Sequence, residues 1–359
     1  MKKILITGKR YNPFHGGIER QSENILNVLL HKDFSVDFLY FTKQRSELTV
    51  HDNIRLIGRH CRVWLSNVCL NPFILLSVLH EGYGTIFIHA PNPVVELVFL
   101  FVPKRRRLII YYHCRARRWP IFGFFHRLIQ KSLFLKADKI AVTTKRFLKY
   151  PELSRHKEKI VEIPNWVAPE FVAQRFYFKG VSPAPHLFFA GRLVWYKGLL
   201  TLIRSLKFCS AHLEIAGEGP LRRKIEKSII EYGLQERVTF LGSISDEQLR
   251  ARYDAAEIFV LPSEDEAEGF GITVIEAMAR GVPVIVSDID SGLADIVRDG
   301  TTGYVFRRGD AADLARVIEF AAENKEKTKK IAENAYNMVK SRYIEQKNVE
   351  KLEALFYNV

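Results

Sequence analysis

The stretch EIFVLPSEDEAEGFGITVIEAMARGVPVIVSD, residues 257–288, contains the pattern that decides the fold. The apolar run EIFVLP is followed by a polar loop with two glycines, an apolar helix-like segment and a second apolar run, PVIVSD. Short apolar strands that alternate with helices are typical of a parallel sheet whose faces are both covered by helices. The stretch therefore predicts a strand–helix–strand unit of a doubly wound α/β domain.

The same alternation extends along the whole chain. Further strands are expected at LFFAGRL, HLEIAGEG and RVTFLG, and in the first half at KKILITG, SVDFLYF, GTIFIHA, RLIIYYH and KIAVTT. The rhythm is interrupted at YFKGVSPAPH, which contains one glycine and two prolines, so a linker is expected within 166–186. A chain of 359 residues is long enough for two domains. We predict two doubly wound domains, 1–175 and 176–341, with a last helix at about 342–359 that packs back on the first.

Composition favours an ordinary globular protein, with 47% hydrophobic and 26% charged residues. The cysteines show no CxxC pair and no zinc-type spacing, so neither a disulfide framework nor a structural metal is expected, and a reducing cytoplasm fits best. They are Cys61, Cys69, Cys114 and Cys209. The first apolar run ends at Gly8, too early for a signal peptide, and charges interrupt every other run before about 18 residues. No membrane-spanning helix is expected.

The net charge of +14 indicates anionic surroundings or partners, since a cationic surface concentrates phosphates, nucleic acid or acidic lipid. No RRM, KH or helix-turn-helix pattern accompanies the charge, so nucleic acid is not an expected partner. A nicotinamide-dependent oxidoreductase would share the α/β rhythm, but the turn after the first strand, TGKRYNPFHGG, lacks GxGxxG. A phosphate-bearing ligand or a lipid surface explains the charge better.

Two cations and a glycine turn follow the first strands of the second domain. Arg192 and Lys197 come just after LFFA and lie beside glycines, as a diphosphate site requires. Arginine supplies a forked contact and lysine a point charge. Gly217 begins the tight turn GEGP, where the backbone can approach a ligand closely. Solvated surface charge and an ordinary loop are the alternatives for these residues.

The glycine loop of the opening stretch leads directly into a helix that begins at about Ile272. The N–H groups of the first turn and the positive end of the helix dipole therefore face a site that suits phosphate and sugar hydroxyls. Glu276, in the first turns of that helix, can accept two hydrogen bonds from a vicinal diol such as a ribose, and Glu268 can bind the hydroxyls of a second sugar. The alternative is that both carboxylates only complement the helix N-terminus.

The spacing Glu268–x7–Glu276, preceded by GRLVWYKG and AGEGP, resembles the retaining glycosyltransferases of family 4 through nearly the whole second domain. The resemblance implies the GT-B fold, in which two Rossmann-like domains face a central cleft. It is similar in particular to mannosyl and rhamnosyl transferases of cell-surface polysaccharide synthesis. Two departures occur: Gly269 stands where many relatives have proline, and Trp166 where many have glycine.

The resemblance also assigns roles. It implies that Arg192 and Lys197 neutralise the donor diphosphate, that Glu276 holds the ribose, and that Glu268 with the backbone after Phe270 holds the transferred sugar. The residues expected to bind the donor are Gly16, Gly17, Arg192, Lys197, Gly217, Phe270, Gly271, Ile272, Thr273 and Glu276. Glu268 and His113 are the expected catalytic residues, because His113 follows the strand RLIIYYH where relatives place a histidine beside the donor sugar.

The resemblance also implies that retention of configuration follows a front-face reaction, in which the departing phosphate takes the proton of the acceptor hydroxyl. No metal and no other cofactor is expected. Asp288-Ile289-Asp290 is similar to the metal-binding DxD of a different glycosyltransferase fold, but it duplicates no role needed here.

A basic segment of the first domain suits a lipid surface. Residues 97–137 contain no acidic residue, and their basic residues are interleaved with bulky aromatics. Each cation near anionic lipid is worth about 1 kcal/mol. The surface is expected to include Arg105, Arg106, Arg107, Arg115, Arg117, Arg118 and Trp119. It predicts a peripheral protein at the inner face of the cytoplasmic membrane that acts on a lipid-linked or lipopolysaccharide glycan.

The motifs leave the nucleotide base and the sugar open, and GDP-mannose is the first expectation for the donor. A GT-B nucleotide-sugar epimerase is the enzymatic alternative, which would release free sugar or an epimerised donor without an acceptor. A basic protein that binds nucleic acid or membrane without catalysis is the more distant alternative.

Overall fold

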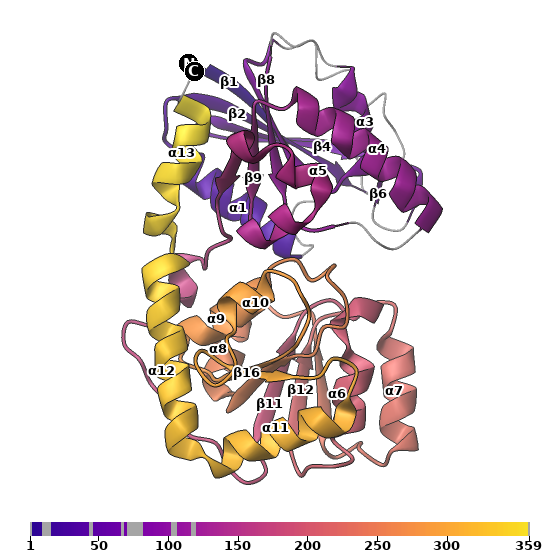
Figure 1. The fold of residues 1–359 in the computed structure, drawn as a ribbon, viewed down its shortest axis with the longest axis vertical. Coiled ribbons are helices and arrows are strands. Elements are labelled where there is room, and N and C mark those ends of the chain that lie inside the picture. The colour runs from indigo at the N-terminus through magenta and orange to yellow at the C-terminus, as the bar shows by residue number, and fades with distance from the viewer. Residues whose placement is uncertain are drawn as a thin grey trace. The chain divides into compact units, whose positions relative to one another are not determined.

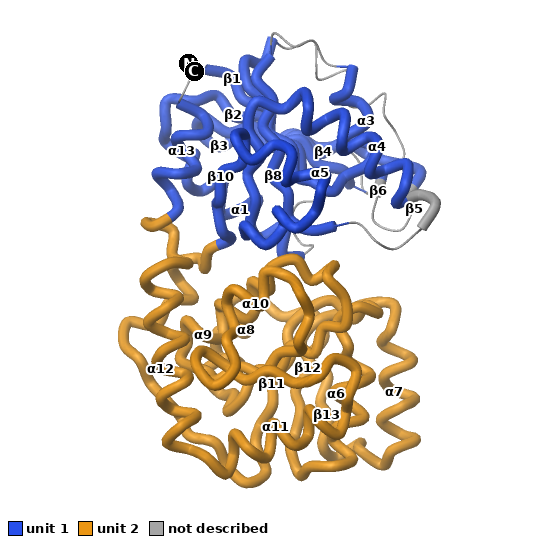
Figure 2. Tube along the Cα trace, viewed as in Figure 1, with its two compact units in different colours: residues 1–165, 348–359 blue, residues 166–347 orange. Residues whose placement is uncertain are grey.

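The computed structural model describes residues 2–8, 16–42, 46–65, 68–69, 82–101, 106–115 and 120–357. The chain forms two compact units, one of Met1–Asn165 with Asn348–Val359 and one of Trp166–Lys347 (Figure 2). The division after Asn165 lies earlier than the expected residue 175, and the returning segment begins at Asn348 rather than at about 342. The glycine and prolines of 177–185 belong to a loop inside the second unit, which is why they mark the boundary poorly.

The first unit is built on an eight-stranded sheet with the order β10-β9-β8-β7-β1-β2-β4-β3. Its strands are β1 (Lys2–Thr7), β2 (Phe34–Thr42), β3 (Glu47–His51), β4 (Ile54–His60), β7 (Thr85–Ala90), β8 (Arg107–Tyr112), β9 (Lys139–Val142) and β10 (Ile160–Glu162). All neighbours are parallel except β3, which pairs with β4 in the antiparallel sense. The chain order reverses between β1 and β7, so ligands are expected at the carboxyl ends of these strands.

Helices cover both faces of this sheet (Figure 1). They are α1 (Gly17–Leu29), α3 (Pro93–Leu100), α4 (Pro120–Lys136), α5 (Pro151–Ser154) and α13 (Val349–Tyr357). On one face, Leu133 of α4 joins a buried core that includes Ile88 of β7. On the other face, the Phe356 ring of α13 lies 5.5 Å from the Phe87 ring. The last helix of the chain is therefore part of the core of the first unit.

A buried polar contact fixes α4 to α3. Glu96 is fully buried, and its Oε2 lies 2.7 Å from Nε2 of the buried His126. The other carboxylate oxygen accepts a hydrogen bond from the backbone N–H of Asn92 at 2.8 Å. Because a buried carboxylate is tolerated only with such partners, the relative orientation of the two helices is well specified.

A disulfide corrects one expectation from the sequence. Cys61 and Cys69 are bonded, with their Cα atoms 6.1 Å apart. The two short antiparallel strands β5 (Trp64–Leu65) and β6 (Val68–Cys69) turn the chain back between them. The bond depends on the alignment of these two strands rather than on a recognisable cysteine spacing, so the sequence rule that requires a CxxC or zinc-like pattern did not detect it.

The second unit contains a six-stranded parallel sheet with the order β13-β12-β11-β14-β15-β16. Its strands are β11 (His186–Ala190), β12 (His212–Ala216), β13 (Val238–Gly242), β14 (Ile258–Leu261), β15 (Val284–Ser287) and β16 (Tyr304–Phe306). Its helices are α6 (Leu199–Ser205), α7 (Arg222–Glu231), α8 (Asp246–Ala255), α9 (Ile272–Ala279), α10 (Leu293–Ile296), α11 (Ala311–Glu323) and α12 (Lys325–Arg342). This is the strand order 3-2-1-4-5-6 of a dinucleotide-binding sheet, which reverses between β11 and β14.

No helix in the described ranges is long and apolar enough to cross a bilayer.

Candidate active site

Two predicted residues meet where the strand order of the second unit reverses. Lys197 follows β11 and Glu268 follows β14, and Lys197 Nζ lies 2.6 Å from Glu268 Oε2. Both side chains are about nine-tenths buried. The Ser263 hydroxyl donates to the same carboxylate oxygen at 3.2 Å. Each charge thus has a partner that compensates its burial.

Backbone segments around this ion pair touch each other directly at glycines. Gly198 has a φ of 68°, and a Cβ at this position would lie 1.8 Å from the carbonyl oxygen of Pro262. Gly217 has a φ of 126°, and its Cβ would lie 2.0 Å from the carbonyl oxygen of Gly191. Only glycine permits both the conformation and the approach, so these residues hold together the loops after β11, β12 and β14.

Helix α9 starts at the same edge of the sheet. Gly271, with a φ of 82°, is its N-cap residue and makes no side-chain cap. Within the first turn, the N–H of Val274 donates to the carbonyl oxygen of Gly271 at 3.0 Å, whereas the N–H groups of Ile272 and Thr273 come too early in the helix to have a partner within it. They are the hydrogen-bond donors that an anion at this point would use.

Glu276 lies one turn further along α9 and is 1% exposed. The Tyr253 hydroxyl donates to its Oε2 at 2.9 Å. Tyr253 lies on α8 and is itself fully buried, with its ring 5.4 Å from that of Phe188 and 5.6 Å from that of Phe259. The carboxylate is therefore held by a side chain whose own position is fixed by the core.

The other predicted donor residues differ in exposure. Arg192 is exposed, and its Nη2 donates to the Tyr196 hydroxyl at 3.1 Å. Phe270 is buried, with its ring 5.7 Å from that of Tyr343. The side chain of Phe270 therefore belongs to the core, and only its backbone could contact a ligand.

In the first unit, the expected residues gather near the β1–β7 reversal. Gly16 is the N-cap residue of α1, which starts at Gly17. His113 follows β8, and its backbone N–H donates to the carbonyl oxygen of Ala90 at 2.9 Å. Its ring nitrogen Nε2 lies 2.8 Å from Nδ1 of His89 on β7. His89 Nε2 in turn lies 3.4 Å from the Ser22 hydroxyl on α1.

Sequence reasoning missed the residues that hold the predicted ones. His89 is the next-to-last residue of its strand, so its place at a carboxyl end was a usable signal. Ser263 was also detectable, because it comes two residues after β14. Tyr253 and Ser22 lie inside helices, and no local pattern separates them from ordinary helix residues.

The expected basic surface is described only in part. Arg105, Arg117, Arg118 and Trp119 lie outside the described residues. Arg106 and Arg107 are partly buried, and burial lowers the pKa of the Arg107 guanidinium. Arg115 lies 3.4 Å from Glu152 Oε1 and over the Tyr150 ring, at 4.6 Å, so it contributes to the packing of the unit.

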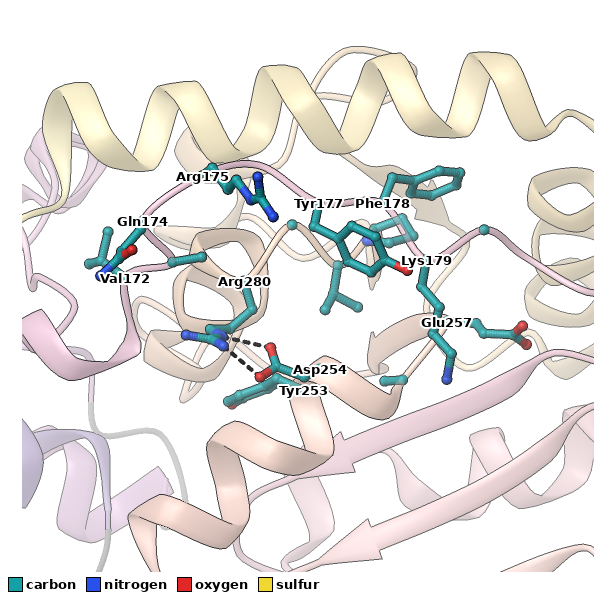
Figure 3. Close-up of a pocket in the computed structure, with 16 residues that line it drawn as sticks. Val172, Gln174, Arg175, Tyr177, Phe178, Lys179, Tyr253, Asp254, Glu257 and Arg280 are labelled. Carbon is teal, nitrogen blue, oxygen red and sulfur yellow. Dashed lines mark hydrogen bonds and ion pairs between the residues drawn. The ribbon is translucent and has the colours of Figure 1, made fainter.

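A cavity of about 610 Å³ lies elsewhere in the second unit, at the amino ends of β14 and β15 (Figure 3). Arg280 and Asp254 line it as a forked ion pair, with Arg280 Nε 2.7 Å from Asp254 Oδ1. Arg175 and Lys179 also line it. None of the residues predicted from the sequence to bind donor or acceptor lines this cavity.

The described residues contain no group of three or more His, Cys, Asp or Glu side chains arranged to hold a metal ion. Asp288 of the DxD-like segment accepts a hydrogen bond from the backbone N–H of Arg308 at 2.8 Å, so its carboxylate supports a turn.

Two doubly wound units with polar groups at the carboxyl ends of their strands have the architecture of the GT-B class. Sucrose-phosphate synthase from Thermosynechococcus elongatus has the same fold, with a TM-score of 0.82 and 20% identity over 100% of this chain and 99% of that one. Residues 175–338 match the family described as "Glycosyl transferases group 1". This segment is a group 1 glycosyltransferase domain, and the protein is a transferase.

Curated relatives extend the similarity beyond that domain. "O-antigen chain mannosyltransferase C" of Escherichia coli is 23% identical over 346 residues, which are 93% of this chain and 92% of the relative. "D-rhamnosyltransferase WbpZ" of Pseudomonas aeruginosa is 26% identical over 253 residues, 69% of this chain and 66% of the relative.

Replacing Gly198 with alanine should destabilise the second unit and displace Lys197, because the new Cβ meets backbone rather than a flexible side chain. Gly233→Ala is the matched control: its φ is 67°, and nothing lies within 4 Å of the added Cβ. We expect Gly233→Ala to cost about 1 kcal/mol of unfolding free energy and Gly198→Ala clearly more, as measured by thermal unfolding. Equal effects of the two substitutions would contradict the close contact.

Proposed function

We propose that the protein is a retaining glycosyltransferase that moves a hexose from a nucleotide-sugar to a lipid-linked or lipopolysaccharide glycan. The observation that carries the proposal is the group of side chains at the β11–β14 reversal. Lys197 and Glu268 are in contact there. Glu276 lies on α9, the helix that starts at the same edge, and is held by Tyr253 of α8. A nucleotide-sugar needs cations for its diphosphate and acceptors for its hydroxyls, and this group offers both.

The Lys197–Glu268 pair has a specific role in this proposal. Before the donor binds, Glu268 is the counterion of the lysine. A diphosphate carries more charge than one carboxylate and competes for the ammonium group, together with Arg192. When Lys197 turns to the phosphate, Glu268 becomes available to accept hydrogen bonds from the hydroxyls of the transferred sugar.

Glu276 is proposed to bind the ribose. The Tyr253 hydroxyl donates to Oε2 of its carboxylate at 2.9 Å, and this hydrogen bond fixes the orientation of the group. Two neighbouring ribose hydroxyls can donate to the same carboxylate. The first turn of α9, at Ile272 and Thr273, would then donate backbone hydrogen bonds to phosphate oxygens.

In the proposed reaction, the acceptor hydroxyl attacks the anomeric carbon from the face that the diphosphate leaves. The bond from carbon to the acceptor oxygen forms while the bond to the phosphate oxygen breaks, and the acceptor proton passes to that phosphate oxygen. Lys197 and Arg192 stabilise the charge that develops on the leaving group. The resemblance to family 4 is the basis for the roles of Gly16, Gly17 and His113, which are to contact the donor phosphates and sugar.

Mannose from GDP-mannose is the proposed donor sugar. Support comes from the names of two relatives, a mannosyltransferase and a rhamnosyltransferase. The first of these relatives is similar over nearly its whole length.

Ligand-induced thermal stabilisation tests the donor site. A nucleotide-sugar at 100 times its dissociation constant should stabilise the protein by about 2.7 kcal/mol. We expect GDP and GDP-mannose to raise the melting temperature more than the UDP and ADP series, and Glu276→Ala to lose the effect. Glu231→Ala, an exposed carboxylate at the end of α7, is the control that should keep it. If no nucleotide-sugar stabilises the wild type, the donor-site proposal fails.

We also propose that transfer needs no metal ion, because Lys197, Arg192 and the N-terminus of α9 supply the positive charge that a divalent cation supplies elsewhere. Transfer measured in EDTA should therefore match transfer in magnesium within about twofold. A large loss in EDTA that magnesium or manganese restores would overturn this proposal.

The outer face of α4 supports a peripheral membrane contact. Phe124, Leu128 and Leu135 are about half exposed or more and lie on one face of the helix, with the exposed Lys131 between Leu128 and Leu135. Phe101, at the end of α3, is 78% exposed. A row of exposed apolar side chains mixed with cations on one helix is typical of a surface that lies in the headgroup region of an anionic bilayer. We propose that this face holds the enzyme at the inner surface of the cytoplasmic membrane.

Flotation with vesicles tests this face. The wild type should float with vesicles that contain anionic lipid and much less with neutral ones. The triple substitution of Phe124, Leu128 and Leu135 by serine should reduce flotation with anionic vesicles at least tenfold. Phe208→Ser removes an equally exposed aromatic from the second unit and should have no effect. Equal flotation of the triple variant would exclude α4 as the contact.

A further inference from the structure

We propose that Ser22 and His89 are positioning residues that fix the proton of His113 on Nε2, so that His113 presents an unprotonated Nδ1 to a sugar hydroxyl. The inference rests on the proposed function for the identity of that ligand. The protonation pattern itself depends only on contacts within the first unit.

Three buried groups from three elements form the chain of contacts. Ser22 of α1, His89 of β7 and His113 after β8 are 2%, 1% and 4% exposed. The two imidazole rings are parallel within 2°, and His89 Nδ1 lies 2.8 Å from His113 Nε2. A separation of 2.8 Å between two ring nitrogens requires one shared proton, because two N–H groups or two lone pairs would repel each other.

The serine decides the direction of this hydrogen bond. Ser22 Oγ donates its single proton to the carbonyl oxygen of Ile18, at 2.8 Å in the preceding turn of α1. Toward His89 Nε2 the hydroxyl is therefore an acceptor, and His89 carries its proton on Nε2. His89 Nδ1 must then accept from His113 Nε2. A neutral imidazole with its proton on Nε2 has Nδ1 unprotonated.

The surroundings favour the neutral form of both rings. Two imidazolium cations at 2.8 Å would repel, and burial disfavours even one of them. The neighbouring ring of Tyr111 lies 4.3 Å from that of His113, and burial raises the pKa of Tyr111. Its hydroxyl donates to the carbonyl oxygen of Ile163 at 2.7 Å, so it does not compete for the histidine proton.

This arrangement also connects the Gly16-Gly17 pair with His113, which are far apart in the sequence. Helix α1, which carries Ser22, begins at the Gly16-Gly17 pair. The same helix therefore places the glycine pair and, through Ser22 and His89, sets the ring of His113. A histidine that accepts a hydrogen bond from a sugar hydroxyl, rather than donating one, would hold that hydroxyl in one orientation.

Nitrogen NMR of the intact chain tests the proposal without any substrate. We expect the His113 ring, assigned by comparison with His113→Gln, to carry its proton on Nε2 in the wild type. His89→Leu removes the acceptor and should give a mixture of the two neutral forms. His89→Asn offers an amide oxygen in place of Nδ1 and should restore the wild-type pattern. Because His89 is buried, Ser22→Ala serves as a milder second variant that should also increase the Nδ1-protonated form.

Kinetics supply the second readout. His89→Leu should lower kcat/KM for transfer by about tenfold or more, which is the usual scale of loss when the hydrogen-bond partner behind a functional histidine is removed. His89→Asn should recover most of the lost activity. His156→Asn is the matched control, since His156 is a buried histidine of the same unit that packs beside Phe134. It should leave the His113 signals and kcat/KM unchanged.

Two results would overturn the inference: a wild-type His113 protonated on Nδ1, or His113 signals that are identical in the wild type and in folded His89→Leu. If the wild type shows the expected pattern but transfers from no nucleotide-sugar, the positioning by Ser22 and His89 stands and the proposed function fails.

Discussion

The direct contact of backbone with backbone at Gly198 and Gly217 is the constraint on which the site of the second unit depends. Both glycines have positive φ, and each faces a carbonyl oxygen at a distance that excludes any side chain. The loops after β11, β12 and β14 are therefore packed as one layer rather than as three separate connections. Lys197 directly precedes one of these glycines, so the same packing restricts the backbone that carries its side chain.

Much of the fold was predictable from the sequence because parallel strands buried on both faces leave continuous apolar runs. β14 and β15 are buried along their whole length and were visible as IFVL and VIVS. The unit boundary was less predictable. Glycine and proline mark any irregular segment, including the loop over 177–185, whereas the division at Asn165 depends on which core each residue joins. The disulfide between Cys61 and Cys69 depends likewise on the antiparallel pairing of β5 with β6, which no spacing rule describes.

For the candidate site, the residue types were predictable and their mutual contacts were not. Loop position and helix spacing identified Glu268 and Glu276 as separate hydroxyl acceptors. The structure adds that Glu268 is in contact with Lys197, and that Glu276 is held by Tyr253 from a different helix. These contacts join residues that lie 71 and 23 positions apart, which is beyond the reach of any local pattern.

The two units differ in this respect for a structural reason. In the second unit, Glu268 and Glu276 come from one loop and the helix that follows it, so a single stretch of sequence contains both. In the first unit, Ser22, His89 and His113 come from α1, β7 and the end of β8, and each stretch contains only one member of the set. A chain of hydrogen bonds across three elements has no linear signature, yet it restricts proton positions more strictly than a loop does, because every member is buried and must satisfy its neighbour. The first unit is thus the part of the molecule where the structure adds most to the sequence.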